Sequence, residues 1–358
     1  MRRGSPAPLV RRLLLAGLGN VGRGFLQILQ SQTALLAERY GVAFRVVGVA
    51  DSSGIASAAE GFDPAAIVEL KRGGGAVADL TGARAGAPAT ALMESTEADA
   101  VLEATPVDLR TGQPGLDVTR AALRRGMAVV LANKGPLALA WAELSTLSDL
   151  GTAGAPPLRF SACVGGAMPT INLGVRDLAG ARILRVEAVL NGTTQYILRA
   201  MEAGRDYAEV LAEAQGRGLT ETDPSLDVDG WDAANKLVIL ANAVLRQPTT
   251  LADVRVEGIA GLTADALRGA AARGERIVLL CLAEANGAGR FQLSVGPAAL
   301  ALDHPLARMD GDEMGVVYHT DIAGRASATS AERDAVPTAA AMLRDLLEIT
   351  RPTADARR

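Results

Sequence analysis

Apolar residues in the first 150 positions fall into short continuous runs that alternate with stretches of helical spacing. Short unbroken apolar runs are typical of strands that are buried on both faces of a sheet. The pattern predicts strands at 9–16, 44–50, 98–103 and 127–132, with helices at about 21–40 and 116–125. Because strands and helices alternate, we expect a parallel, doubly wound sheet. The segment 51–90, which is rich in Gly, Ala and Ser, shows no clear period.

The pattern changes after a Gly/Pro-rich stretch at 151–157, which we take as the domain boundary because 358 residues exceed one ordinary core. The polar run at 220–230 predicts a long loop. The elements expected in this second part are strands at 183–191, 254–259, 275–284 and 291–295, and helices at 194–202, 207–217, 231–245 and 337–348.

Composition excludes several classes of protein. A net charge of −4 argues against a broad nucleic-acid surface, which needs a basic excess. No apolar run reaches the roughly 18 residues of a membrane-spanning helix, so we expect no membrane partner. Two cysteines, Cys163 and Cys281, make a disulfide framework improbable and favour the reducing cytoplasm.

The first predicted strand ends in the sequence Gly17-Leu18-Gly19-Asn20-Val21-Gly22, which opens the first predicted helix. In this context the first glycine permits a tight turn, the second lets a pyrophosphate approach the backbone, and the third lets the helix pack on the strand. The helix N-terminus adds free N–H groups and partial positive charge. We expect a nicotinamide dinucleotide here; the alternative is a glycine turn without a ligand.

Asp51 ends the second predicted strand, where an acid would hold the adenine ribose hydroxyls and disfavour a 2′-phosphate. It lies further from the glycines than the usual spacing of roughly 20 residues, because the intervening helix is long. This position favours NAD, while Arg23 or a loop arginine leaves NADP open.

Only three of the 36 basic residues are lysines, namely Lys71, Lys134 and Lys236. Arginine and lysine exchange readily on a solvated surface, so lysine should persist where a compact, titratable ammonium is needed. Lys71 stands in a polar, glycine-rich run that we interpret as a loop with a chance survivor. Lys134 follows a predicted strand, and Lys236 follows a group of carboxylates.

The segment 218–236 carries five carboxylates between the end of one predicted helix and the start of the next. Asp232 and Lys236 are four residues apart, so both lie on one face of the second helix. The structural alternative is a helix cap with an exposed ion pair, which contributes little stability. A titratable lysine can exchange a proton with an alcohol or carbonyl oxygen, and carboxylates such as Glu221 and Asp232 suit a substrate ammonium group. The segment thus suggests an amino-acid-like substrate with a carbonyl or hydroxyl group.

Together these motifs make the chain resemble the homoserine dehydrogenase family over nearly its whole length. The motifs are Gly-Leu-Gly-Asn-Val-Gly at 17–22, Ala-Asn-Lys-Gly-Pro at 132–136, Val-Gly-Gly-Ala-Met-Pro at 164–169, Asn-Gly-Thr-Thr at 191–194 and the segment 221–236. The resemblance implies NAD(P)-dependent interconversion of L-aspartate 4-semialdehyde and L-homoserine, on the route to threonine and methionine. It also implies a Rossmann domain over 1–150, on which a C-terminal helix at about 335–350 packs back, and an α+β catalytic domain over 151–334 that forms a homodimer.

The resemblance assigns roles by position. Lys236 would give a proton to the developing alkoxide, and Lys134 would share that role or orient the substrate, with Asp232 beside them. The expected substrate-binding acids are Glu221, Asp227 and Asp232. The expected cofactor-binding residues are Gly17, Gly19, Asn20, Val21, Gly22, Asp51, Thr105, Asn133 and Lys134. The chain has no room for the regulatory domain of longer family members, so we expect no feedback control through one.

The chain also departs from the family pattern. Ser161 stands where many members have a glutamate that helps to hold a monovalent cation. The backbone carbonyls of Val164 and Gly166 remain as ligands, and without the carboxylate we expect no tight sodium site. The charged run 332–334 replaces a glycine turn near the cofactor. These departures leave two alternatives open: a paralogue that reduces a related amino-aldehyde, and a dinucleotide-binding sensor without turnover.

Overall fold

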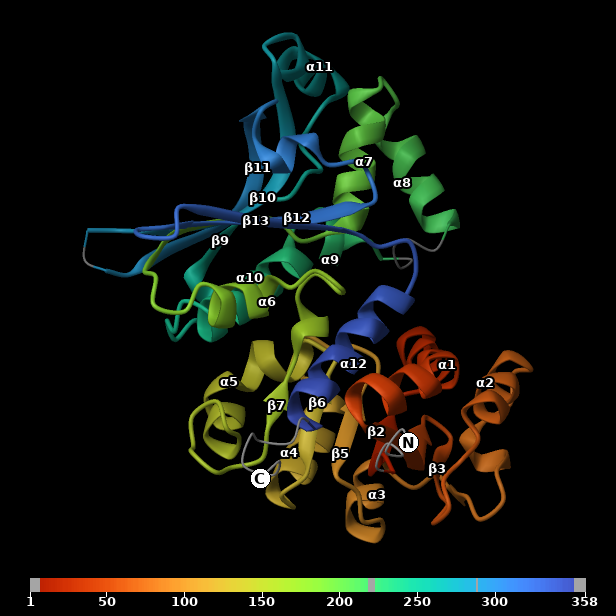
Figure 1. Cartoon of the computed structure of the whole chain (residues 1–358). Helices are drawn as coiled ribbons and strands as arrows, with labels where there is room; N and C mark the ends of the chain where they lie inside the picture. The colour runs from red at the N-terminus through yellow and green to blue at the C-terminus, as the bar shows by residue number, and fades with distance from the viewer. Residues whose placement is uncertain (1–6, 218–222, 288, 351–358) are drawn as a thin grey trace, which may run out of the picture. The chain divides into compact units, whose positions relative to one another are not determined.

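The computed structural model describes residues 7–217, 223–287 and 289–350 (Figure 1). The chain forms two compact units, which we describe separately. Unit 1 runs to Gly166 and resumes at Asp334, and unit 2 comprises Ala167–Arg333. The Gly/Pro-rich stretch at 151–157 lies within unit 1, between its last long helix before the break and its last strand.

Unit 1 is built on a seven-stranded sheet with the order β4-β3-β2-β1-β5-β6-β7. Neighbouring strands pair in parallel along the run β2-β1-β5-β6-β7. The remaining strands, β3 and β4, add an antiparallel edge next to β2. The parallel core confirms the doubly wound sheet, and the edge lies in the segment without a clear period. The strands are β1 (Leu9–Ala16), β2 (Val42–Asp51), β3 (Gly54–Ser57), β4 (Arg84–Ala85), β5 (Ala100–Glu103), β6 (Ala128–Leu131) and β7 (Leu158–Arg159).

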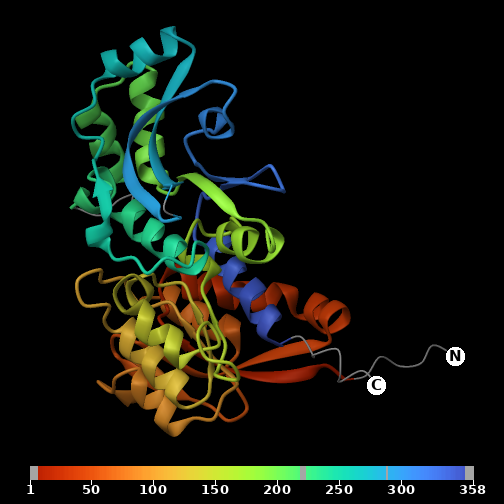
Figure 2. The same cartoon turned by 90° about the vertical axis from the view of Figure 1, so that its left-hand side faces the viewer.

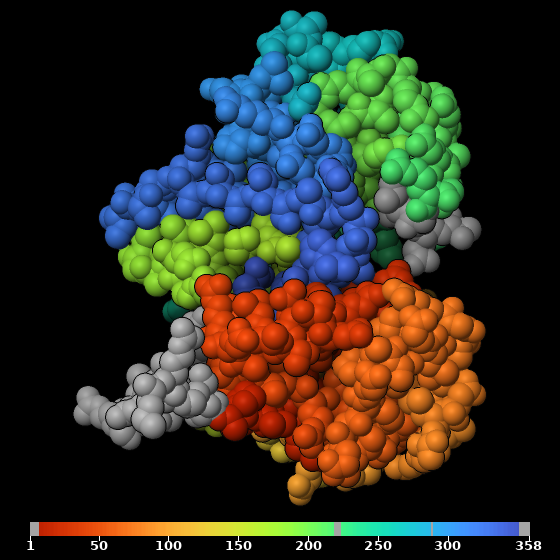
Figure 3. Space-filling model, turned by 45° about the vertical axis from the view of Figure 1, so that its right-hand side comes forward, coloured from red at the N-terminus to blue at the C-terminus, as the bar shows by residue number. Residues whose placement is uncertain are grey.

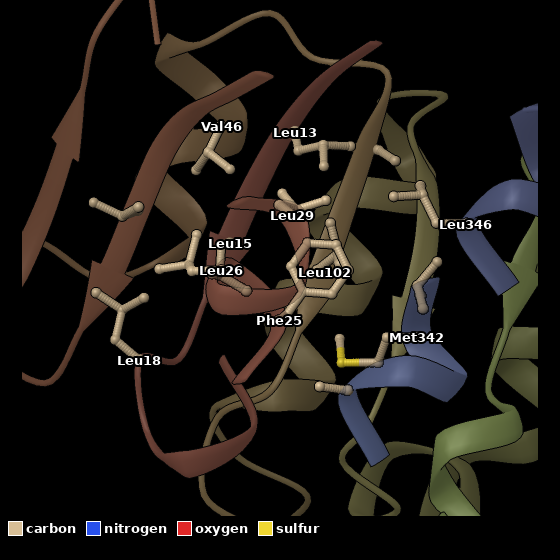
Figure 4. Packing of buried hydrophobic residues seen from close by; sticks show 14 of the residues in the cluster. Leu13, Leu15, Leu18, Phe25, Leu26, Leu29, Val46, Leu102, Met342 and Leu346 are labelled. Carbon is tan, nitrogen blue, oxygen red and sulfur yellow. The ribbon is translucent and has the colours of Figure 1, made fainter. Parts of the chain in front are cut away.

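Helices cover both faces of this sheet. Figure 4 shows Phe25 and Leu26 of one helix, with Met342 of the C-terminal helix, packed against Leu13 and Leu102 of the central strands. The burial of both faces explains why the central strands are continuous apolar runs. The segment from β1 to the second helix forms a continuous outer surface of the unit (red to orange in Figure 3). The helices are α1 (Asn20–Leu35), α2 (Pro64–Arg72), α3 (Thr90–Ser95), α4 (Gly115–Arg124), α5 (Gly135–Leu147) and α12 (Val336–Thr350).

Unit 2 contains a six-stranded sheet with the order β13-β12-β8-β10-β11-β9, in which only β9 and β11 pair in parallel. Its helices α7 (Gly192–Glu202) and α10 (Trp231–Ala243) gather on one side of the strands (Figure 2). The strands are β8 (Ile183–Val189), β9 (Val254–Val256), β10 (Glu275–Ala285), β11 (Phe291–Ala301), β12 (Glu313–Thr320) and β13 (Arg325–Ala331). The remaining helices are α6 (Thr170–Asn172), α8 (Tyr207–Gly216), α9 (Ser225–Val228) and α11 (Ala264–Ala272).

The strands β12 and β13, the helix α11 and the short α6 of unit 2 have no counterpart among the sequence predictions. β13 consists of small residues that alternate between half-buried and exposed, and α11 is rich in alanine, so neither carries a strong hydrophobic pattern. α9 adds a helical turn inside the predicted loop at 220–230. None of the helices in the described ranges has the length and apolar character needed to cross a membrane.

Candidate functional site

The glycine loop joins β1 directly to α1, and steric contacts require two of its glycines. Gly17 has a φ of +96°, and a Cβ atom there would lie 2.3 Å from the carbonyl oxygen of Ala104. A Cβ atom at Gly22 would lie 2.1 Å from the carbonyl oxygen of Gly17. No other residue fits at these positions without moving the backbone.

Gly19 differs from its neighbours, because no heavy atom lies within 4 Å of its Cβ position. It is the N-cap of α1, where no side chain caps the helix and the first turn carries no acidic residue. The N–H groups of Asn20 and Val21 lie in this first turn, where the 16-residue helix has the positive end of its dipole. This geometry fits a dinucleotide pyrophosphate, which needs close backbone approach and free donors.

Asp51 lies at the end of β2, as expected, but its carboxylate is already hydrogen-bonded. Oδ1 accepts the backbone N–H and the hydroxyl of Ser53, at 2.9 and 2.5 Å. Oδ2 accepts Lys71 Nζ at 2.7 Å and the N–H of Val77 at 3.2 Å. Burial opposes ionisation, yet the Lys71 and Ser53 hydrogen bonds hold the pKa of Asp51 below its usual value. The placement of Lys71 in a loop is wrong: it lies in the last turn of α2 and pairs with Asp51.

The loops after β5 and β6 bring Thr105 and Asn133 together. Asn133 Nδ2 donates to Thr105 Oγ1 at 3.3 Å and to the carbonyl of Pro106 at 3.2 Å. The side-chain oxygen of Asn133, Oδ1, accepts the N–H of Gly135 at 2.9 Å, in the first turn of α5. Lys134 is half-buried and is the N-cap residue of α5. It lies between Asn133 and Gly135, which this hydrogen bond joins.

Lys236 and Asp232 form a buried pair on α10. The ammonium nitrogen lies 2.8 Å from Asp232 Oδ2 and donates to the carbonyl oxygen of Leu190 at 2.6 Å. Only 14% of the lysine side chain and 11% of the aspartate side chain are exposed. The alternative of an exposed ion pair is therefore wrong. Among the described residues the third N–H of the ammonium has no acceptor, so it is available to a substrate oxygen.

Asn191 connects this pair to a second carboxylate. Its Nδ2 donates to Asp232 Oδ2 at 2.9 Å and to Asp227 Oδ1 at 2.7 Å, while its carbonyl oxygen caps α7 by accepting the N–H of Thr194 at 2.8 Å. Two of the three predicted substrate acids are thus adjacent. The third, Glu221, lies outside the described residues.

The segment of the proposed cation ligands is a turn around Val164 and Gly166, whose φ is +53°. Ser161, at the start of this turn, donates its backbone N–H to Asp345 Oδ2 of α12 at 2.7 Å. The described residues contain no group of three or more His, Cys, Asp or Glu side chains able to hold a metal ion. Whether the two carbonyls bind a monovalent cation stays a prediction.

The charged run 332–334 makes specific local contacts. Glu332 Oε1 accepts the N–H of Ala167 at 2.6 Å, and Arg333 Nε lies 2.7 Å from Asp312 Oδ2. Asp334 Oδ1 accepts the N–H of Val336 at the start of α12, at 2.8 Å. These side chains thus replace the turn of the family pattern with hydrogen bonds of their own.

The structure therefore gathers the predicted residues into a group in each unit. Unit 1 holds the glycine loop, Asp51 and the Thr105–Asn133 contact; unit 2 holds Asp227, Asp232 and Lys236. Two residues that the sequence reasoning did not select take part: Asn191 and Glu103, whose carboxylate binds Thr105. Asn191 belongs to the Asn-Gly-Thr-Thr motif, which could have identified it. Glu103 ends an apolar strand and has no comparable signal.

Comparison with known proteins gives a consistent result. The family model described as "Homoserine dehydrogenase" matches residues 169–347, and the model of the homoserine dehydrogenase NAD binding domain matches 17–154. A homoserine dehydrogenase of Methanocaldococcus jannaschii is 35% identical over 95% of this chain and 99% of its own length. An NAD(+)-dependent homoserine dehydrogenase of Pseudomonas canavaninivorans is 34% identical over 94% and 96%, respectively. A hyperthermophilic archaeal homoserine dehydrogenase solved in complex with NADPH superposes with a TM-score of 0.79 at 26% identity, covering 96% of this chain and 98% of that one.

Proposed function

The chain belongs to the homoserine dehydrogenase family, and we propose that Lys236, Asp232 and Lys134 are the residues that serve its reaction. The protein is an NAD(P)-dependent oxidoreductase that interconverts L-homoserine and L-aspartate 4-semialdehyde in threonine and methionine biosynthesis. The proposal rests above all on the Lys236 ammonium, which is held between Asp232 and the Leu190 carbonyl and has, among the described residues, one N–H left for a ligand.

Lys236 supplies the proton in the direction of reduction. The nicotinamide, when bound, provides the hydride that adds to the aldehyde carbon. The aldehyde oxygen gains negative charge as the hydride arrives, and the Lys236 N–H donates its proton to that oxygen, which yields the hydroxyl of homoserine. In oxidation the hydroxyl proton of homoserine passes to the Lys236 nitrogen. Lys134 shares this role or orients the substrate.

The acids of unit 2 bind the amino group of the substrate. An α-ammonium group needs carboxylate acceptors. Asp227 and Asp232 both accept a hydrogen bond from the Asn191 amide, so their carboxylates lie close together. Asn191 keeps the two carboxylates apart by donating one N–H to each. We include Glu221 in this set because of its position in the motif.

The cofactor lies on unit 1. Gly17, Gly19, Asn20, Val21 and Gly22 form the pyrophosphate cradle, since the space at Gly19 and the uncapped start of α1 suit an anion. The second part of the proposed cofactor site consists of Asp51 at the ribose and of Thr105, Asn133 and Lys134 at the nicotinamide half.

Substitution of Lys236 tests the proton transfer. We expect both Lys236→Ala and Lys236→Arg to lower kcat by at least about 100-fold, since alanine removes the proton and an arginine guanidinium does not release one. The assay follows absorbance at 340 nm with homoserine and with NAD or NADP separately. Cofactor binding by fluorescence and the thermal midpoint serve as controls for folding. An active Lys236→Arg enzyme would contradict the role, and a wild-type enzyme inactive with homoserine would favour a related amino-aldehyde.

We also propose that the protein works as a homodimer in the cytoplasm. Both cysteines are buried, and neither forms a disulfide among the described residues, in keeping with a reducing compartment. One face of the sheet in unit 2 carries half-buried apolar side chains that a second copy could cover.

Comparing activity in sodium, potassium and bulky organic cations tests the proposed carbonyl ligands of Val164 and Gly166.

A further inference from the structure

Glu103 is a buried carboxylate for which the reaction described above has no use. It ends β5 with no exposed surface. Oε1 accepts the backbone N–H of Thr105 at 2.8 Å and also the Thr105 hydroxyl hydrogen. Oε2 is buried and accepts no hydrogen bond from the residues that the structure describes. Burying a carboxylate without a cation is costly, so its retention at this position needs a reason.

The hydrogen bonds from Glu103 continue in one direction through two loops. The single hydroxyl hydrogen of Thr105 is donated to Glu103, so its oxygen is left to accept Asn133 Nδ2 at 3.3 Å. The side-chain oxygen of Asn133, Oδ1, then accepts the Gly135 N–H at 2.9 Å. The carboxylate at the start of this relay therefore fixes the orientation of Thr105, of the Asn133 amide and of the backbone on both sides of Lys134.

The same carboxylate lies against the elements that carry the cofactor. A Cβ atom at Gly17 would lie 2.6 Å from the backbone nitrogen of Thr105, so the glycine turn packs directly on the loop that Glu103 holds. A Cβ atom at Gly115, where α4 begins, would lie 2.9 Å from Glu103 Oε2. The carboxylate is thus enclosed between β5, α4 and the two loops.

We propose that Glu103 is a positioning residue for hydride transfer, which acts through Thr105 and Asn133 to align the cofactor-binding loop with the backbone of Lys134. The inference rests on the proposed function and adds a residue that touches neither substrate nor cofactor. Burial raises the pKa of Glu103 to about 7, although the hydrogen bonds from Thr105 act to lower it. The relay therefore loses its charged acceptor as the pH falls through neutrality.

Three variants separate positioning from mere packing. Glu103→Gln keeps the shape and removes the charge, Thr105→Val keeps the volume and removes the hydroxyl, and Thr105→Ser restores the hydroxyl. We expect Glu103→Gln and Thr105→Val each to lower kcat for homoserine oxidation at least about tenfold, with KM for homoserine within about threefold, because small misplacements of reacting groups slow catalysis strongly. We expect Thr105→Ser to recover most of the kcat that Thr105→Val loses. We also expect the fall of kcat as the pH is lowered through 7 to be smaller in Glu103→Gln than in the wild type, since the variant keeps only the pH dependence that Lys236 contributes.

Asp345→Asn is the matched control, since Asp345 is a buried carboxylate of the same unit that also accepts a backbone N–H. We expect it to keep the wild-type pH profile of kcat. The inference is overturned if Glu103→Gln has the wild-type kcat and pH profile, or if it changes only the thermal midpoint. If Glu103→Gln does not fold, a Thr105→Val enzyme with unchanged kcat overturns it instead. A wild-type enzyme that does not oxidise homoserine rejects the proposed function, and this inference with it.

Discussion

The ion pair of Asp51 and Lys71 bears on cofactor choice. A free carboxylate at the ribose repels a 2′-phosphate, but here Lys71 Nζ lies 2.7 Å from Oδ2 and both side chains are largely buried. If Asp51 lies at the ribose, as we propose, the Lys71 ammonium compensates the charge that would exclude NADP. We therefore expect the wild type to use both NAD and NADP.

Removing this lysine should shift the preference. In Lys71→Met the Asp51 charge is uncompensated, so we expect the ratio of kcat/KM for NADP to that for NAD to fall about tenfold, which corresponds to about 1.4 kcal/mol. The measurement is kcat/KM with each cofactor at saturating homoserine. Asp51→Asn is the reciprocal control and should raise the ratio. An unchanged ratio in Lys71→Met would remove Lys71 from cofactor selection.

At the residue scale, the sequence identifies functional side chains whose residue type is rare in this chain. It misses side chains whose hydrogen-bond partners are distant in the sequence. The scarcity of lysine identifies Lys236 and Lys134 from the chain alone. It fails for Lys71, because the acid that binds it lies 20 residues away on another element. Glu103 could not be found either, since only the fold shows that its carboxylate is buried against Thr105 and Asn133.

At the scale of elements, the strand–loop–helix unit of β1 and α1 offers a sharp contrast between two glycines. Gly17→Ala would place a Cβ atom 2.3 Å from a backbone oxygen at a positive φ, whereas Gly19→Ala meets no protein atom within 4 Å. We expect Gly17→Ala to lower the thermal midpoint by several degrees. We expect Gly19→Ala to leave the midpoint unchanged and to weaken NADH binding at least about tenfold, measured by fluorescence titration. Full cofactor affinity in Gly19→Ala would mean that the pyrophosphate does not lie on this turn.

The contact between α12 and the turn at Ser161 predicts a pH-dependent stability. Burial raises the pKa of Asp345 to about 6, so the folded protein binds this proton more tightly than the unfolded chain does. The stabilisation is complete below pH of about 4 and is lost as the pH rises through 6. Between pH 5 and pH 8 we expect the wild type to lose about 1.4 kcal/mol of unfolding free energy relative to Asp345→Asn. Urea unfolding of both proteins at the two pH values measures this difference, and a constant difference would contradict the shifted pKa.

Helices and strands were predicted correctly where burial produces a clear pattern of apolar residues along the chain. The strands β1, β2, β5 and β6 are confirmed because helices on both faces require continuous apolar runs. β12 and β13 were missed because a glycine and small polar residues interrupt their alternation, and their pairing with β8 is set by distant parts of the chain. The antiparallel edge of the first sheet was missed because β3 and β4 are short.

At the scale of the whole molecule, the resemblance contributed what the pattern could not. Hydrophobic periodicity predicts a doubly wound sheet followed by a different kind of fold, but it names no reaction. The reaction follows from five motifs that are far apart in the sequence and match one family together, a match that the comparisons over nearly the entire chain confirm. The roles of single residues within that reaction stay predictions.

The sheet of unit 2 supports the prediction of a homodimer. Cys281 faces α10, so its neighbours Leu280 and Leu282 lie on the opposite face of the same strand. That face carries the half-buried side chains of Leu282, Ala298 and Leu300 around a small buried cluster. Half-buried apolar groups gathered on one sheet face are typical of a surface that a partner covers.

Leu282→Arg should therefore separate the protomers. In a twofold dimer every side chain of the interface occurs twice, so one substitution introduces two like charges and buries both. We expect the wild type to elute at twice the chain mass in size-exclusion chromatography with light scattering, and Leu282→Arg to elute as a monomer with unchanged helix content. Leu150→Arg, an exposed leucine of unit 1, is the control and should stay dimeric. A dimeric Leu282→Arg would place the interface elsewhere, whereas a monomeric wild type would reject the dimer itself.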